Sequence, residues 1–150
     1  MSLTPAVIAY RVAVPNDVTP VTYFFHEHRK AISESAVGPE FLCSMGIHAA
    51  MRRGEMVVAS SGAKIVGAVR IYRRKTVQRI SVYQFAVQEA YRGLGIFKNL
   101  LAFCGDNIFE VKCRKDSLIN EYFHSTGWVG VSCEGNESTW RLTLPASVNQ

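Results

Sequence analysis

The chain has 150 residues, of which 48% are hydrophobic and 19% are charged, and it carries a formal net charge of +5 at pH 7. This length and balance predict one globular domain over residues 1–150 with a substantial core, and they exclude a disordered chain. No apolar run approaches the roughly 20 residues of a membrane span, and no basic region followed by an apolar block marks a signal peptide, so we expect a cytoplasmic protein.

The first part of the chain predicts one strand and two helices. Alternating β-branched residues predict a strand over residues 6–14. Thr19 followed by Pro20 is typical of a helix start, and this helix continues to residue 35 before a Gly-Pro pair breaks it. A second helix is expected over residues 39–53. Its apolar side would hold Phe41, Leu42, Met45 and Ala49.

The middle of the chain predicts an antiparallel meander of three strands, over residues 55–60, 64–73 and 78–87. A tight Ser-Gly-Ala turn separates the first two strands, and a polar Arg-Lys-Thr turn leads to the third. A helix follows the meander. Its apolar residues recur at spacings of three and four, as on one helix face, and are Phe97, Leu100, Leu101, Cys104 and Ile108.

The last part of the chain predicts a strand, a helix and a closing hairpin. The strand covers residues 109–113 and follows a crossover helix, so it should lie parallel to the last strand of the meander. Asp116 or Ser117 would cap the next helix, and the closing strands would cover residues 128–133 and 139–144. The inward residues of that helix would be Leu118, Ile119, Tyr122 and Phe123. This order predicts a mixed, mostly antiparallel α/β sheet of seven strands with helices on both faces.

The most informative segment joins the meander to the helix that follows it, over residues 87–98. Gly93 and Gly95 at this junction let backbone N–H groups approach an anion closely, and the start of the helix adds a partial positive charge. Arg92 and Lys98 flank the junction with full charges. The segment therefore predicts a pyrophosphate site, although its spacing fits neither the P-loop nor the dinucleotide-binding fingerprint.

Two motifs, together with the element order, link this chain to a known family. Arg92 and Gly95 fit a loop that reads Arg or Gln, two residues, Gly, any residue, then Gly or Ala, whereas Phe97 departs from its last position. A late aromatic pair followed by glycine and another aromatic residue is formed by Tyr122, Phe123, Gly127 and Trp128. In these features, and over nearly its whole length, the chain resembles the GNAT superfamily of acyl-CoA-dependent N-acyltransferases.

The resemblance implies acetyl-CoA or another acyl-CoA as co-substrate and direct attack of an amine on the acyl group. By the same resemblance, the strand that ends at Val87 would separate from the next parallel strand, and a backbone N–H near Val87 would stabilise the oxyanion. The backbone of Phe85, Ala86 and Val87 would bind the pantetheine arm. The pyrophosphate would be held by the amides of Gly93, Leu94, Gly95, Ile96 and Phe97 and by the side chains of Arg92 and Lys98.

The sequence offers three candidate residues for proton transfer. The family often has a tyrosine acid at the second residue of the late aromatic pair, but Phe123 has no hydroxyl group. Tyr122 is then the candidate acid, with a role as a core aromatic as the alternative, and Tyr83 and Glu89 are the candidate bases. Tyr83 could instead line the acceptor pocket, and Glu89 could instead face solvent.

Metal ligands are not expected in this sequence. Its four cysteines lie far apart without a CxxC pair, which argues against zinc and favours reduced, mostly buried thiols. His26 and His28 flank Glu27, but alternate residues on a helix point apart, so this run predicts a charged helical face. We therefore expect neither a metal site nor a disulfide.

Three functions remain open from the sequence. The favoured one is an N-acetyltransferase that acts on an amine of a small molecule or a macromolecule. The basic cluster between Arg70 and Arg79 leaves a nucleic-acid or tRNA-base acyltransferase as an alternative, although a solvated hairpin turn also explains it. The missing hydroxyl at Phe123 leaves a non-catalytic CoA-binding regulatory module. No membrane partner is expected, and a homodimer stays open.

Overall fold

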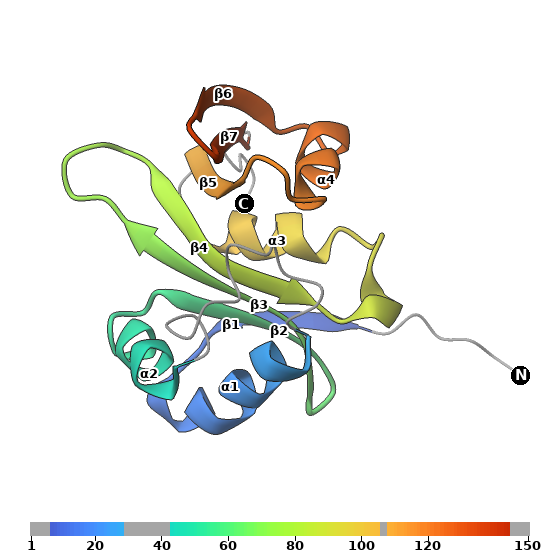
Figure 1. Ribbon diagram of the computed structural model, residues 1–150. Coiled ribbons are helices and arrows are strands. Elements are labelled where there is room, and N and C mark those ends of the chain that lie inside the picture. The colour runs from blue at the N-terminus through green and yellow to red at the C-terminus, as the bar shows by residue number, and fades with distance from the viewer. Residues whose placement is uncertain (1–6, 29–42, 106–107, 145–150) are drawn as a thin grey trace, which may run out of the picture.

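A computed structural model describes residues 7–28, 43–105 and 108–144 (Figure 1). Seven strands form one sheet in the order β1-β2-β3-β4-β5-β7-β6, and β4 and β5 are parallel whereas the other neighbouring strands are antiparallel. The strands are β1 (Ile8–Val12), β2 (Met56–Ser61), β3 (Lys64–Arg73), β4 (Ile80–Val87), β5 (Ile108–Arg114), β6 (Val129–Glu134) and β7 (Glu137–Thr143). The helices are α1 (Val18–Glu27), α2 (Ser44–Arg52), α3 (Ile96–Phe103) and α4 (Ile119–Ser125). The predicted mixed, mostly antiparallel sheet and its element order are confirmed.

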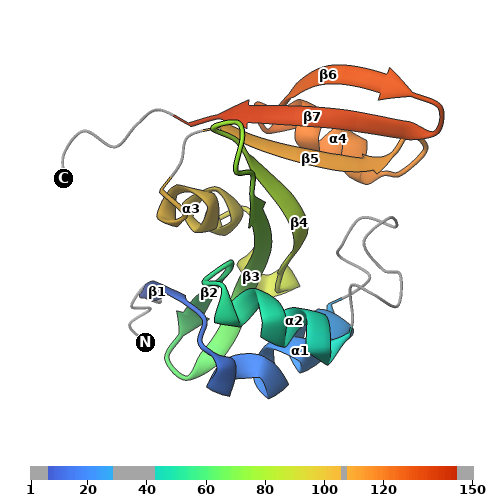
Figure 2. The ribbon, with the colours of Figure 1, turned by 90° about the vertical axis from the view of Figure 1, so that its left-hand side faces the viewer.

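Helices cover both faces of the sheet, as predicted. Figure 2 shows α3 on the opposite side of β3 and β4 from α1 and α2. The core on the α1 and α2 side includes Phe25, Ile47 and Met56. The core on the side of α3 and α4 includes Leu100 and Phe123. None of the described helices is long and apolar enough to cross a membrane.

The start of α1 differs from its prediction. The helix begins at Val18, directly after a 3-10 turn over Pro15–Asp17, so Pro20 lies inside the first turn. A proline is tolerated there because the first backbone N–H groups of a helix have no acceptor within it. Asp17 organises this corner, since its carboxylate accepts the N–H of Val14 at 2.8 Å and pairs with Arg11 at 2.7 Å.

The apolar face of α2 also differs from its prediction. Met45 is 80% exposed, whereas Ile47, Ala50 and Met51 are buried against the sheet. The predicted face was therefore wrong, because Ile47, Ala50 and Met51 pack against the sheet in place of Met45. Phe41 and Leu42 lie outside the described residues, as do the predicted end of the first helix and the start of the second.

Two further expectations about the apolar residues were wrong. Ile108 is the first residue of β5 and not the last residue of the α3 stripe, because α3 ends before Gly105, whose φ is +93°. On α4, Leu118 is 83% exposed and Tyr122 is 37% exposed, so neither residue is inward as predicted. The N-cap of α4 is Leu118 and not Asp116 or Ser117, although the Oγ of Ser117 accepts the N–H of Ile119 at 3.3 Å.

The four cysteines are free in the structure, and contrary to the prediction they are not mostly buried. Cys104 and Cys113 are buried, whereas Cys43 and Cys133 are exposed. In the described parts of the chain, no group of three His, Cys, Asp or Glu side chains could hold a metal ion.

One glycine sets how closely α3 approaches the sheet. A Cβ atom at Gly67 in β3 would come within 2.9 Å of Cγ2 of Ile96 and within 3.4 Å of Cδ1 of Leu100. Gly67 lies opposite Val87 in the β3–β4 ladder. The missing side chain therefore brings the first turn of α3 down beside the end of β4.

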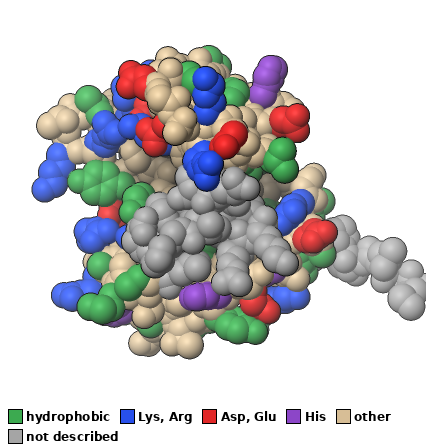
Figure 3. All heavy atoms as spheres, in the orientation of Figure 1, with side chains coloured by type: hydrophobic (Ala, Val, Ile, Leu, Met, Phe, Trp, Pro, Cys, Tyr) green, Lys and Arg blue, Asp and Glu red, His purple; other side chains and the backbone are tan. Residues whose placement is uncertain are grey.

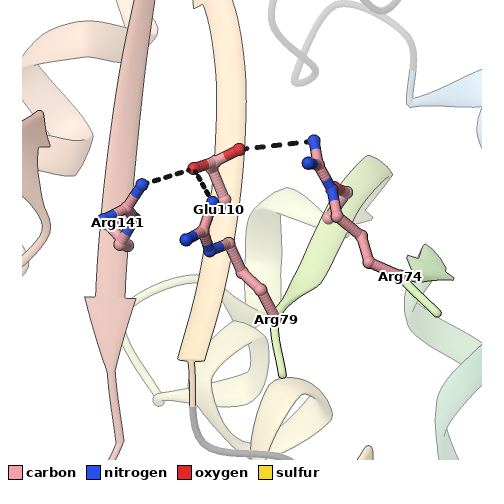
Figure 4. A network of polar contacts seen from close by, with 5 residues as sticks. Arg74, Arg79, Glu110 and Arg141 are labelled. Atoms are coloured by element: carbon pink, nitrogen blue, oxygen red, sulfur yellow. Dashed lines mark hydrogen bonds and ion pairs between the residues drawn. The ribbon is translucent and has the colours of Figure 1, made fainter. Parts of the chain in front are cut away.

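A buried carboxylate ties β5 to its neighbours (Figure 4). Glu110 lies at the centre of three arginines, with Arg141 of β7 at 3.0 Å, Arg79 at 3.4 Å and Arg74 at 3.7 Å. Arg79 directly precedes β4, and Arg74 directly follows β3. The network therefore joins the β3–β4 hairpin to the β5–β7 pair at the place where β4 and β5 meet.

We expect Gly67→Ala to lower the free energy of unfolding by about 1–3 kcal/mol, because the added methyl group must displace Ile96. Gly130→Ala in β6 is the matched control, since its Cβ would meet the ring of Trp140 at an ordinary 3.7 Å. That control should be neutral or slightly stabilising. Denaturant unfolding measures both, and a Gly67→Ala protein as stable as the wild type would show that this close approach sets nothing.

We expect Glu110→Gln to lower the free energy of unfolding by about 1–3 kcal/mol, because it leaves three cations around an uncharged amide. The arginines are partly exposed, so solvent screens part of the effect. Asp116→Asn is the control, because the exposed pair between Asp116 and Arg114 should contribute less than about 0.5 kcal/mol. Equal stabilities of the two variants would contradict a structural role for the network.

Candidate active site

The central feature of the site is the separation of β4 from β5. The two strands pair over three residues each, from Ile80 to Val82 and from Phe109 to Val111, although β4 continues to Val87. In the β3–β4 ladder Arg70 faces Gln84 while Ile71 faces Val82, which leaves Tyr83 as an extra residue. Such a bulge bends its strand. Figure 2 shows β4 running away from β5 beyond their shared end.

The hydrogen-bond pattern decides which backbone groups of β4 face the gap. The N–H of Gln88 bonds to the carbonyl of Val66 at 2.8 Å. Bonding and non-bonding positions alternate along an antiparallel ladder, so the backbone groups of Val87 and Phe85 point to the opposite edge, towards β5. The same alternation directs Ala86 to β3. Of the three residues predicted to contact a pantetheine arm, Phe85 and Val87 therefore offer backbone groups to the gap.

A glycine turn follows the end of β4. Gly93 and Gly95 have φ angles of +82° and +78°, and Gly95 immediately precedes α3. The amides of Gly93, Leu94 and Gly95 donate to no backbone carbonyl in the described parts of the chain. Nothing lies within 4 Å of where a Cβ of either glycine would stand. The turn therefore presents open backbone donors at a helix start, which is the arrangement that binds anions.

Two cations flank this turn. The Nε of Arg92 donates to the carbonyl of Val87 at 3.3 Å, which holds the guanidinium at the end of β4. The Nζ of Lys98 lies 3.9 Å from the position that a Cβ of Gly127 would take, so Lys98 reaches the turn after α4. The predicted pyrophosphate residues form one continuous segment, Arg92 to Lys98, around the start of α3, although the Nζ of Lys98 lies at the turn after α4. Ile96 and Phe97 are buried, so only their backbone could contact a phosphate.

The side chain of Phe97 is buried in the core, as predicted. Its ring stacks on that of Phe85, with centroids 4.1 Å apart, and lies 6.1 Å from the ring of Trp128. Phe123 packs against the same cluster and is fully buried. The departure from the family loop at Phe97 therefore adds a core residue at the start of α3.

A cleft of about 570 Å³ opens beside the separated strands. Its walls come from the end of α2, from β3, β4 and β5, and from the start of β7. Among the lining residues are Arg70, Tyr72, Tyr83, Phe85, Glu110 and Lys112. Because Phe85 both lines this cleft and directs backbone groups into the gap, a molecule in the cleft would lie next to the free edge of β4.

The three candidates for proton transfer lie in different places. Tyr83 is 42% exposed and lines the cleft. Tyr122 lies on α4, with its ring 6.3 Å from that of Phe97, and burial raises its pKa above the usual value. Glu89 is exposed on the 3-10 turn Glu89–Tyr91 and does not line the cleft. The structure therefore brings Tyr83 to the cleft and Tyr122 to the start of α3, and leaves Glu89 outside.

The basic residues between Arg70 and Arg79 make different contacts in the structure. Figure 3 shows Lys and Arg side chains gathered over the β3–β4 hairpin. Arg73 donates to the carbonyl of Cys104 at 3.0 Å, while Arg74 and Arg79 hold Glu110. Most of these cations are therefore engaged within the domain, which weakens the argument for a nucleic-acid surface.

Sequence reasoning missed the distinct position of Arg70. It was grouped with the hairpin, yet it lies inside β3 and lines the cleft. The available signal was strand alternation, which places Arg70 on the same face as the buried Ala68. Glu110 was also missed. It is a charged residue at a buried position of the short strand β5.

Comparisons with known proteins agree with this geometry. A family model of the acetyltransferase (GNAT) domain matches residues 33–143. No curated protein is significantly similar in sequence. The PaiA N-acetyltransferase from Thermoplasma acidophilum, solved in complex with coenzyme A, has a TM-score of 0.73 at 10% identity, and the match covers 92% of this chain and 99% of that one.

Two further solved structures share the fold. A GNAT-family acetyltransferase from Listeria monocytogenes has a TM-score of 0.71 at 14% identity, covering 96% of this chain and 99% of that one. YncA from Salmonella typhimurium, a putative acetyltransferase solved with its cofactor acetyl-CoA, has a TM-score of 0.61 at 13% identity, covering 95% and 96%. The family model spans well over half of the sequence, and the chain therefore belongs to the GNAT acetyltransferase family.

Proposed function

We propose that this protein transfers an acetyl group from acetyl-CoA to an amine by direct attack. The observation that carries the proposal is the coincidence of two sites on one strand: β4 has a free edge beyond Val82, and the glycine turn follows its end. A ligand that carries a diphosphate and an extended arm fits both sites together. Two proteins of the same fold were solved with coenzyme A or acetyl-CoA, which supports this choice of ligand.

The residues of the turn would hold the diphosphate. The open amides of Gly93, Leu94 and Gly95 are donors at a helix start, and Arg92 and Lys98 add two positive charges. The backbone groups of Phe85 and the N–H of Val87, whose carbonyl already accepts the Nε of Arg92, would then pair with the amide groups of the pantetheine arm, as an added strand would.

Acetyl-CoA supplies an activated acyl group, so the protein needs no nucleophile of its own. What the chain must supply is orientation, a donor for the charge that develops on the carbonyl oxygen, and a proton for the departing thiolate. The outward N–H groups of Phe85 and Val87 are the nearest backbone donors at the free edge. Tyr122 is the proposed proton donor, because its ring lies 6.3 Å from that of Phe97 at the start of α3 and a phenol is protonated at neutral pH.

The acceptor amine would enter through the cleft beside β4. Tyr83 lies on its wall and can orient a neutral amine through its hydroxyl oxygen, whereas taking a proton from the amine would require Tyr83 in its phenolate form. Glu89 is not proposed as a base, since it lies outside the cleft.

We expect Arg92→Ala to weaken the binding of acetyl-CoA by about tenfold or more, because it removes a charge-assisted contact to a phosphate. Arg114→Ala is the control, since Arg114 is exposed at the end of β5 and pairs with Asp116. Calorimetric titration of both variants and the wild type measures the difference. Equal affinities for all three proteins would remove the turn from the binding site.

We expect Tyr122→Phe to lower kcat by about 10- to 100-fold while leaving the affinity for acetyl-CoA unchanged, because only proton donation is lost. Tyr23→Phe on α1, an exposed residue outside the cleft, is the control. Because burial raises the pKa of Tyr122, the protonated form persists above the ordinary value of about 10, so this group causes no loss of rate below that pH. A fully active Tyr122→Phe protein would reject this role.

A regulatory module that binds CoA without turnover is the second candidate, and the buried Phe123 at the usual acid position favours it. Release of free CoA thiol over a panel of amines separates the two functions. Binding of acetyl-CoA with no thiol release from any amine would favour the regulatory module.

A further inference from the structure

The guanidinium of Arg70 is fixed in place inside the cleft. Its central carbon lies 4.6 Å from the centroid of the Tyr83 ring, a cation–π contact. A Cβ at Gly46 of α2 would come within 3.4 Å of both terminal nitrogens, so the absent side chain leaves the room that the guanidinium occupies. Arg70 is therefore held by β4 and α2 while it lines the cleft.

This fixed cation has no anionic partner in the described parts of the chain. Its Nη1 atom is buried and forms no hydrogen bond there. Glu55 is engaged elsewhere, since its carboxylate accepts Nε of Arg53 at 2.6 Å and the N–H of Arg73 at 2.9 Å. Burial lowers the pKa of Arg70, and the charges of Tyr83, Cys43 and Glu55 offset only part of that effect. A buried donor without a partner is costly and needs an explanation.

The rest of the cleft favours an anion as well. Its charged lining residues are Arg53, Arg70, Arg74, Lys112, Glu110 and Glu137. Glu110 already shares its charge with three arginines, so positive charge dominates in the cleft. Like charges that line one cleft raise the local concentration of ligands of opposite sign.

The position of Arg70 also limits the size of the ligand. Arg70 lies opposite Gln84 in the β3–β4 ladder. Along β4, Gln84 precedes Phe85 by one residue and Val87 by three residues. A strand rises about 3.3 Å per residue, so the position of Arg70 along β4 is roughly 3–10 Å from the free backbone groups of Phe85 and Val87. A small molecule spans this distance between its amine and its acidic group.

We propose that Arg70 binds an anionic group, a carboxylate or a phosphate, of the acceptor, so that the acceptors are small molecules carrying both an amine and an acid. This inference rests on the proposed acetyl transfer. Arg70 then acts in acceptor specificity, and its planar fork pairs with two oxygens of the acid at once.

Matched pairs of amines test the proposal. L-Lysine is compared with cadaverine, which lacks the carboxylate, and phosphoethanolamine with ethanolamine, which lacks the phosphate. The wild type should prefer the acidic member of at least one pair by about tenfold or more in kcat/KM, the value of a charge-assisted hydrogen bond. The pair that shows the preference identifies the acid. Equal rates within both pairs would overturn the proposal.

Variants assign the preference to Arg70. Arg70→Gln should abolish it, and Arg70→Lys should keep only part of it, because lysine retains the charge without the fork. The affinity for acetyl-CoA should stay unchanged in both variants, since Arg70 lies away from the glycine turn. Arg52→Gln, on the exposed end of α2 outside the cleft, should behave as the wild type. A preference that survives in Arg70→Gln would refute the assignment.

A measurement without turnover separates this proposal from the proposed function. The Nε–H signal of Arg70 in the NMR spectrum, assigned by its loss in Arg70→Lys, should shift when propionate or inorganic phosphate is added to the wild type. If the Arg70 signal shifts with an anion but the protein does not bind acetyl-CoA, the proposed anion site stands and the proposed acetyl transfer is rejected. No shift with either anion, together with no preference within the amine pairs, would reject the anion site.

Discussion

The structure depends on one constraint: β4 and β5 must be joined at one end and apart at the other. Three parallel residue pairs and the Glu110 network hold the joined end, where Arg74, Arg79 and Arg141 converge on one buried carboxylate. The bulge at Tyr83 begins the separation, because an extra residue in one strand bends it away from its former partner. A stronger β4–β5 ladder would close the gap, and a weaker joined end would let the sheet divide into two halves. The opening therefore exists because the attraction between the strands is confined to one short stretch.

Strand β4 both pairs with β3 and presents free backbone groups to the gap, because the hydrogen-bonding directions of successive residues alternate. Gln88 and the residues in phase with it bond to β3 and keep β4 in the sheet, while Val87 and Phe85 direct their donors and acceptors into the gap. Gly67 adds the third part, since only a residue without a side chain lets Ile96 bring the start of α3 beside the end of β4. The glycine turn and the free edge of the strand are therefore held at a fixed distance by packing and not by a flexible loop.

The sequence predicted the features that depend on local pattern. The bounds of β3 were predicted at both ends, and the glycine turn was found because left-handed φ angles at Gly93 and Gly95 leave a plain mark in a sequence. Prediction from the sequence failed where a tertiary contact determines which residues are buried or where an element ends. The buried face of α2 depends on where that helix starts, and Ile108 fits the α3 stripe in spacing although Gly105 ends the helix first. The divergence of β4 from β5 followed only from resemblance, and the ties of Arg70 and Glu110 to distant residues leave no local signal.

Backbone groups and side chains carry different parts of the proposed chemistry, and this difference would let the chain depart from the family pattern while it keeps the proposed site. The grip on a diphosphate and on an extended arm uses amides and carbonyls, which any sequence supplies once the fold and a few glycines are in place. Phe97 can therefore stand in the loop, because its ring packs against those of Phe85 and Trp128 in the core while its amide belongs to the first turn of α3. Proton transfer and acceptor choice use side chains, and these are the positions that change. Phe123 has lost the hydroxyl, and Tyr122 is its neighbour with a raised pKa. Arg70 occupies the cleft where an acceptor would bind. A backbone-built site of this kind tolerates the low sequence identities seen among proteins of this fold, and it leaves substrate choice free to vary on the cleft wall.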